Sequence, residues 1–447
     1  MASSDSDGAQ QERAGLPVGL AAEPESAEGM PSDAILATAA PDLMVDSLGE
    51  YTRVWLKRVR SGESGALPVI LGLVAIVIFF QLKNSLFLSA GNLVNLMTQA
   101  AFLVTFGMAE VFVLLLGEID LSVGYLAANG AVITAYLLSV AHPVPWWVAV
   151  LAGLACTSVW GLIQGFIITK LGLPSFVVTL AGLLGGAGLL LYLTNRLAPF
   201  GGTIILSNNI LLDVDSGASL TPTASWIVMV AAVLLGGVFL MLRDSRRRAS
   251  NLAAPPASVT LLKIALMAVA GVVVVLIGNT NRATVGVLRG VPWVVLVILV
   301  LLIAWTVLLS RTRFGRYVYA IGGNAEAARR AGISLTRIRI LAFVLCGLTA
   351  GITGIIYTSY LGSISNNFQG GQYVLYGVAG AVIGGTSLFG GRGRMLGAVL
   401  GGLIVGVIYN GLFLLGLQTA AQEMWTALVL LAAVTVDTLA RRGSART

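Results

Sequence analysis

Three carboxylates interrupt parts of the chain that are otherwise apolar, and they are the first candidates for chemistry. Glu110 lies within the apolar run 93–116, and Glu118 and Asp120 follow in the segment 117–124, which reads GEIDLSVG. A charge at membrane depth is costly, so such a residue usually faces a cavity or a partner. These three residues and Ser122 are therefore candidates for a path taken by a polar substrate or an ion.

Some of these polar positions also have a structural interpretation. Asp120 is well placed as the N-cap of the next helix, with its side chain accepting a hydrogen bond from the amide near Ser122 or Val123. Gln99 and Asn410 lie in apolar runs of their own. For both, a contact with a passing polar solute and hydrogen bonding between helices remain open.

A second candidate site is the basic segment 311–339. Within it, Glu326-Ala327-Ala328, three residues and then Gly332 predict a short Ala-rich helix ended by glycine. Such a helix, lying on the membrane surface, can dock into a partner's groove, and an ordinary basic loop is the alternative. The candidate docking residues are Arg316, Gly323, Asn324, Glu326, Ala327, Ala328 and Gly332.

Several kinds of chemistry are excluded or disfavoured. No stretch matches G-x-x-x-x-G-K-[ST], the phosphate-binding loop of an ATPase. His142 is the only histidine, and Cys156 and Cys346 both lie in apolar runs, which disfavours a metal centre, a His-based catalytic triad and a disulfide framework. We expect no catalytic residue, no metal and no cofactor. Because the phosphate-binding loop is missing, energy for any driven process must come from a partner or from an ion gradient.

The elements that position these residues are predicted to be membrane helices. The chain is 57% hydrophobic and 11% charged, whereas a soluble protein has roughly 25% charged residues. We expect an all-α, polytopic transmembrane bundle of about 12 spans, with 10 as the lower limit because three stretches are short. The stretches are 67–82, 93–116, 121–141, 146–169, 175–193, 226–242, 261–278, 291–309, 340–360, 373–389, 395–415 and 425–439.

Basic residues test this arrangement independently, because they gather in loops on the cytoplasmic side. In this sequence they concentrate in alternate loops, above all in 311–339. This pattern predicts that both termini are cytoplasmic in a multi-pass inner-membrane protein. It also explains the formal net charge of +7 without a nucleic-acid partner, since the positive charges do not share one soluble face.

The first 50 residues differ from the rest of the chain. They hold ten of the 20 acidic residues beside a single Arg13. Such a segment buries too little apolar surface to offset its chain entropy. We therefore expect a disordered, acidic cytoplasmic tail over residues 1–48, a transmembrane domain over 49–442 and a short cytoplasmic tail over 443–447.

Four segments together resemble the permeases of ABC-type importers for ribose, xylose and galactose. Residues 319–333 (YAIGGNAEAARRAGI) are similar to the coupling loop of that family. Residues 117–124, 170–180 (KLGLPSFVVTL) and 384–393 (GGTSLFGGRG) match three further motifs in the family's order. Glu118, where many members have glycine, and the extra length over 243–290 look like the xylose-type branch.

The resemblance implies a function and partners. It implies a permease that carries a simple sugar, a pentose such as xylose, and that pairs with a second permease copy. A cytoplasmic ATP-binding subunit would bind segment 311–339, and an extracytoplasmic sugar-binding protein would deliver the substrate. The alternative from another class is an ion-coupled secondary transporter, which would use carboxylates at the membrane midplane, such as Glu110, Glu118 and Asp120.

Overall fold

The computed structural model describes residues 67–139, 144–198, 201–215, 218–250, 254–283, 286–418, 420–421, 423–428, 431 and 435. The predicted tails 1–48 and 443–447 lie outside the described residues, as does most of the predicted span 425–439. The helices are α3 (Leu67–Lys83), α4 (Ala90–Leu114), α5 (Val123–Leu137), α6 (Trp146–Lys170), α7 (Ser175–Leu197), α8 (Asn209–Leu212), α9 (Pro222–Ala249), α10 (Ala257–Asn279), α11 (Trp293–Arg311), α12 (Arg313–Gly323), α13 (Ala325–Arg330), α14 (Leu335–Leu361), α15 (Gly370–Ile383) and α16 (Met395–Leu414).

The structure is almost entirely helical, as the composition predicts. In the described part of the chain, eight helices are long and apolar enough to cross a membrane: α4, α6, α7, α9, α10, α11, α14 and α16. Three further apolar helices, α3, α5 and α15, are shorter. The helical membrane architecture is confirmed, whereas the count of about 12 spans and the side of the termini remain predictions.

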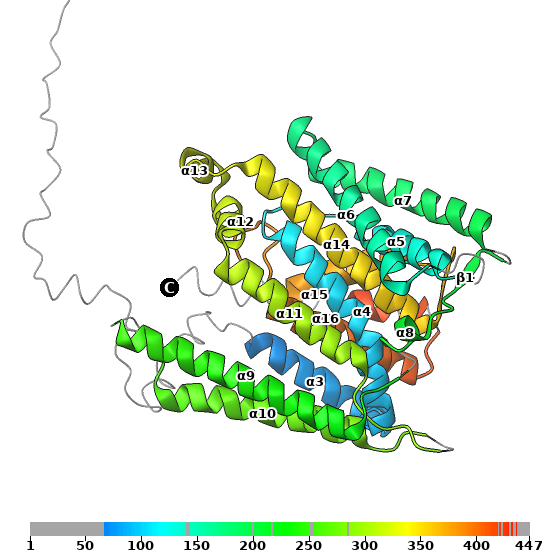
Figure 1. Cartoon of the computed structure of the whole chain (residues 1–447), viewed down its shortest axis with the longest axis vertical. Coiled ribbons are helices and arrows are strands. Elements are labelled where there is room, and N and C mark those ends of the chain that lie inside the picture. The colour runs from blue at the N-terminus through cyan, green and yellow to red at the C-terminus, as the bar shows by residue number, and fades with distance from the viewer. Residues whose placement is uncertain are drawn as a thin grey trace, which may run out of the picture.

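Helix α4 forms the centre of the bundle (Figure 1). It packs against α14, α15 and α16, and most of its residues are buried. Helices α9 and α10 form a hairpin at the periphery of the bundle (Figure 1). Burial in α4 therefore comes from protein contacts on nearly all sides, which explains how it accommodates polar side chains that lipid would exclude.

Glycine permits a close and extensive contact between α6 and α14. A Cβ atom at Gly161 would collide with the carbonyl oxygen of Phe343, and one at Gly347 would collide with that of Thr157. The two backbones touch at these points, as small residues allow in membrane helix pairs.

Two predicted spans are shorter than a bilayer requires. Helix α5 has 15 residues and α15 has 14, which at 1.5 Å per residue gives about 22 Å and 21 Å against a hydrocarbon core of about 30 Å. The N-terminal ends of α5 and α15 are in contact, because a Cβ atom at Gly124 would collide with the carbonyl oxygen of Gly370. The stretches 121–141 and 373–389 are thus helical over a shorter length than the sequence predicted.

A small sheet lies at one end of the bundle, which we call the sheet end. Strand β1 (Thr203–Ile205) pairs antiparallel with β2 (Ser363–Ser365), with Thr203 opposite Ser365. The pair ties the segment after α7 to the segment after α14. At the opposite end, α12 and α13 project beyond the bundle (Figure 1), and we call this the coupling end.

Candidate functional site

The predicted docking segment contains two helices, α12 and α13. Asn324 caps α13, with its side-chain oxygen accepting a hydrogen bond from the Ala327 amide at 2.9 Å. Glu326 forms ion pairs with Arg329 at 2.7 Å and Arg330 at 3.1 Å, all on an exposed face. Asn324 is thus the cap of α13, and Glu326 places a negative charge in its first turn.

The end of α13 depends on Gly332. Its φ of +80° lies in the left-handed region that favours glycine, and the space around it is open. Ala328, on the inner face of α13, is buried, whereas Gly323 and Arg316 are not. The segment therefore presents Glu326 and the arginines outward and holds Ala328 against the bundle.

Helix α12 fixes this segment to the bundle. Val318 and Ile321 are buried against Leu115, Met395 and neighbouring apolar residues. The Tyr319 hydroxyl donates a hydrogen bond to the Gly393 carbonyl at 2.8 Å, and burial raises the pKa of this phenol above its usual value while nearby Arg394 opposes the rise. Helix α12 thus connects α13 to the bundle through a packed contact.

Three glycine-containing segments that are far apart in sequence contact one another at the coupling end of the bundle. A Cβ atom at Gly322 would collide with the Leu115 carbonyl oxygen, and one at Gly390 would crowd the backbones of Gly117 and Gly322. Gly391 donates its amide to the same Leu115 carbonyl at 2.9 Å. The structure thus joins three of the four motifs of the sequence analysis at the coupling end.

Glu118 lies at this coupling end, in the turn after α4. Its Oε1 lies 3.3 Å from Nε of Arg339, on the first turns of α14, as an ion pair without hydrogen-bond alignment. The pair links the turn after α4 to the helix that follows the docking segment.

Glu110 and Asp120 lie deeper, inside the bundle. Both side chains are fully buried, and neither oxygen of Glu110 has a hydrogen-bond partner among the described residues. Oδ1 of Asp120 accepts from the Ser122 amide at 2.9 Å and the Ser122 hydroxyl at 2.6 Å. The predicted bond to the Ser122 amide is present, although Ser122 itself occupies the N-cap of α5.

Ser122 extends this polar group to α6, because Gln164 Nε2 donates to its hydroxyl oxygen at 3.0 Å. Thr179 of α7 donates to the Ile119 carbonyl at 3.1 Å. Backbone groups of the extended segment before α5 thereby form hydrogen bonds with other parts of the protein. Irregular backbone at membrane depth requires such bonds. Among the described residues, no group of three or more His, Cys, Asp and Glu could hold a metal ion.

Gln99 and Asn410 hold two helices together. Asn410 Nδ2 donates to Gln99 Oε1 at 2.9 Å, and Asn92 Nδ2 donates to Asn410 Oδ1 at 2.9 Å. All three side chains are thus engaged between α4 and α16. Of the two interpretations open from sequence, helix-to-helix bonding describes their geometry in this structure.

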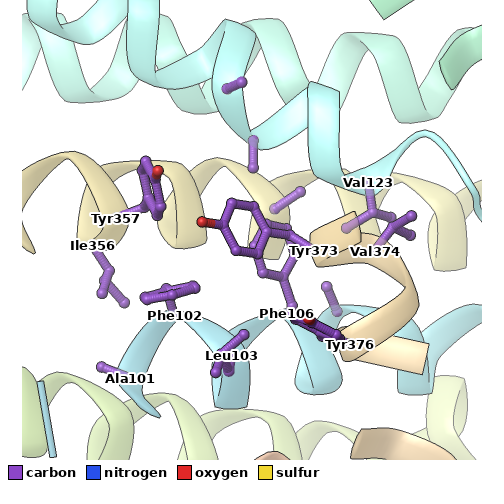
Figure 2. Packing of buried hydrophobic residues seen from close by; sticks show 14 of the residues in the cluster. Ala101, Phe102, Leu103, Phe106, Val123, Ile356, Tyr357, Tyr373, Val374 and Tyr376 are labelled. Carbon is purple, nitrogen blue, oxygen red and sulfur yellow. The ribbon is translucent and has the colours of Figure 1, made fainter. Parts of the chain in front are cut away.

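Sequence reasoning missed an aromatic cluster at the start of α15. The Tyr373 ring lies 5.4 Å from that of Phe102, 5.5 Å from that of Tyr357 and 5.1 Å from that of Phe368. Figure 2 shows Tyr373 between the helices that carry Phe102 and Tyr357. The spacing of Gln369, Gln372, Tyr373 and Tyr376 at three and four residues was the available signal.

Comparison with known proteins places this arrangement in a family. Residues 92–434 match the family model described as "Branched-chain amino acid transport system / permease component". The xylose transport system permease protein of Escherichia coli K12 is 33% identical over 84% of this chain and 92% of its own length. The ribose import permease protein of Bacillus subtilis is 33% identical over 85% of this chain and 95% of its own.

A third relative, the xylose transport system permease protein of Haemophilus influenzae, is 33% identical over 84% of this chain and 97% of its own length. No solved structure matches the chain significantly. The family match and the relatives each cover most of the chain and include the coupling end, and the apolar helices are long enough to span a membrane. The chain therefore belongs to the ABC permease family that includes these xylose and ribose permeases, and it is a multi-pass inner-membrane protein.

Proposed function

We propose that this chain is the membrane-spanning subunit of an ATP-driven importer for a simple sugar, a pentose such as xylose. Hydrolysis would be carried out by a separate subunit, since the sequence has no phosphate-binding loop of its own. A second permease copy and an extracytoplasmic sugar-binding protein complete the proposed assembly. The names of the xylose and ribose relatives support the substrate class.

The observation that carries this proposal is the placement of α13. It presents Glu326, Arg329 and Arg330 on an exposed face, while α12 packs against the end of α4 and the turn between α15 and α16. A subunit that bound and moved α13 would therefore also move the end of α4 and the turn between α15 and α16. Arg316, Gly323, Asn324, Ala327, Ala328 and Gly332 shape the same surface and remain proposed contacts or supports for the ATPase.

Reconstitution tests the proposal directly. Vesicles containing the permease, the ATPase and the binding protein should accumulate labelled xylose only with ATP on the ATPase side. Uptake that needs no ATP and disappears when an ionophore collapses the ion gradient would support the ion-coupled alternative. Glu110 and Asp120, buried and incompletely partnered, are the observation in favour of that alternative.

Orientation needs its own test, with Cys156 and Cys346 first replaced. An impermeant thiol reagent added from outside should label a cysteine in place of the exposed Asn367, at the sheet end. It should not label one in place of Glu326. The opposite pattern would overturn the assignment of the coupling end to the cytoplasm.

A further inference from the structure

Two adjoining cavities lie where α15 begins. No residue of the docking segment lines either of them. Their volumes are about 540 Å³ and about 480 Å³, and they share Gln369, Gln372, Tyr376 and Glu423 in their walls. Because α15 begins against Gly124 inside the bundle, the cavities lie at membrane depth, on the sheet side of the molecule.

The cavity walls combine aromatic faces with neutral polar groups. Tyr409 and Phe413 of α16 line one cavity and Tyr125 of α5 lines the other. Gln372 Nε2 donates to the Tyr376 hydroxyl oxygen at 2.6 Å, and the same hydroxyl also bonds the side chain of Thr426. Aromatic rings with one polar end suit a ligand that has both apolar and hydrogen-bonding surface.

The charged residues in the cavity walls indicate which class of ligand the cavities can bind. The lining residues of both cavities include one carboxylate, Glu423, and no Lys or Arg. A phosphorylated sugar or an amino acid would bring an anionic group with no cation to receive it, and an unpaired charge at this depth is costly. A neutral polyhydroxylated ring meets no such penalty, because its hydroxyls can pair with amide, phenol and carboxylate groups.

The aromatic wall of the smaller cavity packs against the bundle, and the polar residues predicted from sequence are absent from the linings of both cavities. Tyr373 is held by the rings of Phe102, Tyr357 and Phe368. Gln99 and Asn410 are bonded to each other between α4 and α16. Gln369, Gln372, Tyr376 and Glu423 are thus the polar residues that line both cavities.

We infer that these cavities form the site through which the sugar passes after its release from the binding protein. This inference rests on the proposed import function. The Gln372 and Glu423 side chains and the Tyr376 hydroxyl would bond the sugar hydroxyls, while the Tyr409 ring would cover its apolar C–H face. The site would bind weakly, since a tight site would retain the substrate.

A glycine pair offers a matched test in the full reconstituted complex. Gly371 lines the larger cavity and Gly185 lies on the exposed face of α7, and a Cβ atom at either would meet nothing within 4 Å. Gly371→Trp should abolish labelled-xylose uptake while ATP hydrolysis still responds to sugar-loaded binding protein. Gly185→Trp should retain both activities. Wild-type uptake by Gly371→Trp would overturn the site.

A second measurement decides the case in which Gly371→Trp also loses ATPase stimulation. With Cys156 and Cys346 replaced, Gln369→Cys should react with an impermeant thiol reagent, and saturating xylose should slow that reaction. A rate unchanged by xylose would overturn the site. Failure of the wild-type complex to take up any simple sugar would instead reject the proposed function, so the two failures are distinguishable.

Discussion

The amide of Gly391 donates a hydrogen bond to the carbonyl oxygen of Leu115 at 2.9 Å, and the backbone of Gly322 lies against the same carbonyl. One peptide group at the end of α4 therefore contacts both the turn between α15 and α16 and helix α12, which precedes α13. Side chains at these positions would separate the three segments, which explains why glycines occur in all of them.

Gly322→Ala should destabilise the permease, because the added methyl group collides with the Leu115 carbonyl. Overpacking of this kind costs about 1–3 kcal/mol. Gly323→Ala is the matched control, since a Cβ atom there meets nothing within 4 Å. Thermal unfolding of the two purified variants is the measurement, and equal midpoints would contradict the proposed contact.

Glu326→Lys should weaken binding of the ATPase subunit. The change breaks the ion pairs with Arg329 and Arg330 and adds a third positive charge to the exposed face. An interface hot spot is worth about 2 kcal/mol, which corresponds to roughly 30-fold in affinity. Copurification with the ATPase measures the effect, with Ser207→Lys, exposed near the sheet end, as control. Unchanged copurification would show that α13 is a solvated connection.

The ion pair between Glu118 and Arg339 predicts rescue by charge exchange. Their side chains are 13% and 30% exposed, so a like-charged pair would be poorly screened. Glu118→Arg and Arg339→Glu should each lower stability and uptake, and the double exchange should recover part of both. Coupling energies between contacting residues are about 0.5–3 kcal/mol. Additive losses in the double variant would show that the two side chains do not interact.

Glu110 and Asp120 should respond differently to neutral replacement. Glu110→Gln should preserve or raise thermal stability, because it removes a buried acid that has no partner in the described structure. Asp120→Ala should lower it by about 1–3 kcal/mol, since the Ser122 amide and hydroxyl lose their acceptor. Loss of uptake in a stable Glu110→Gln variant would assign this residue to transport.

Asp215 predicts a pH dependence at the sheet end. Its carboxyl is buried and has no hydrogen-bond partner among the residues that the structure describes, and burial raises its pKa from 3.8 to about 8. The folded state thus holds the proton more tightly, so docking of this loop is strongest below pH 4 and weakens as the pH rises to about 8. Hydrogen exchange of residues 209–215 should quicken over that range, and Asp215→Asn should remove the dependence. Exchange that is equally pH-dependent in Asp215→Asn, after correction for the intrinsic rate, would reject the role of this carboxyl.

Much of the architecture follows from local sequence. A long apolar run must become a helix in lipid, because every backbone group then bonds within its own segment; α6, α7 and α11 begin and end within a few residues of the predicted stretches. The helix at Glu326 and its end at Gly332 are also local, since they depend on alanine content and on a positive φ that glycine tolerates.

The tertiary structure alone decided what the polar residues do. Gln99 and Asn410 are 311 positions apart, and Glu118 meets Arg339 only because the turn after α4 comes close to the start of α14. Hydropathy describes each residue's own preference for lipid, whereas a hydrogen bond or a collision depends on where a distant backbone passes. For the same reason the short lengths of α5 and α15 could not be recognised from their apolar runs, and the cavities at the start of α15 emerged only from the folded chain.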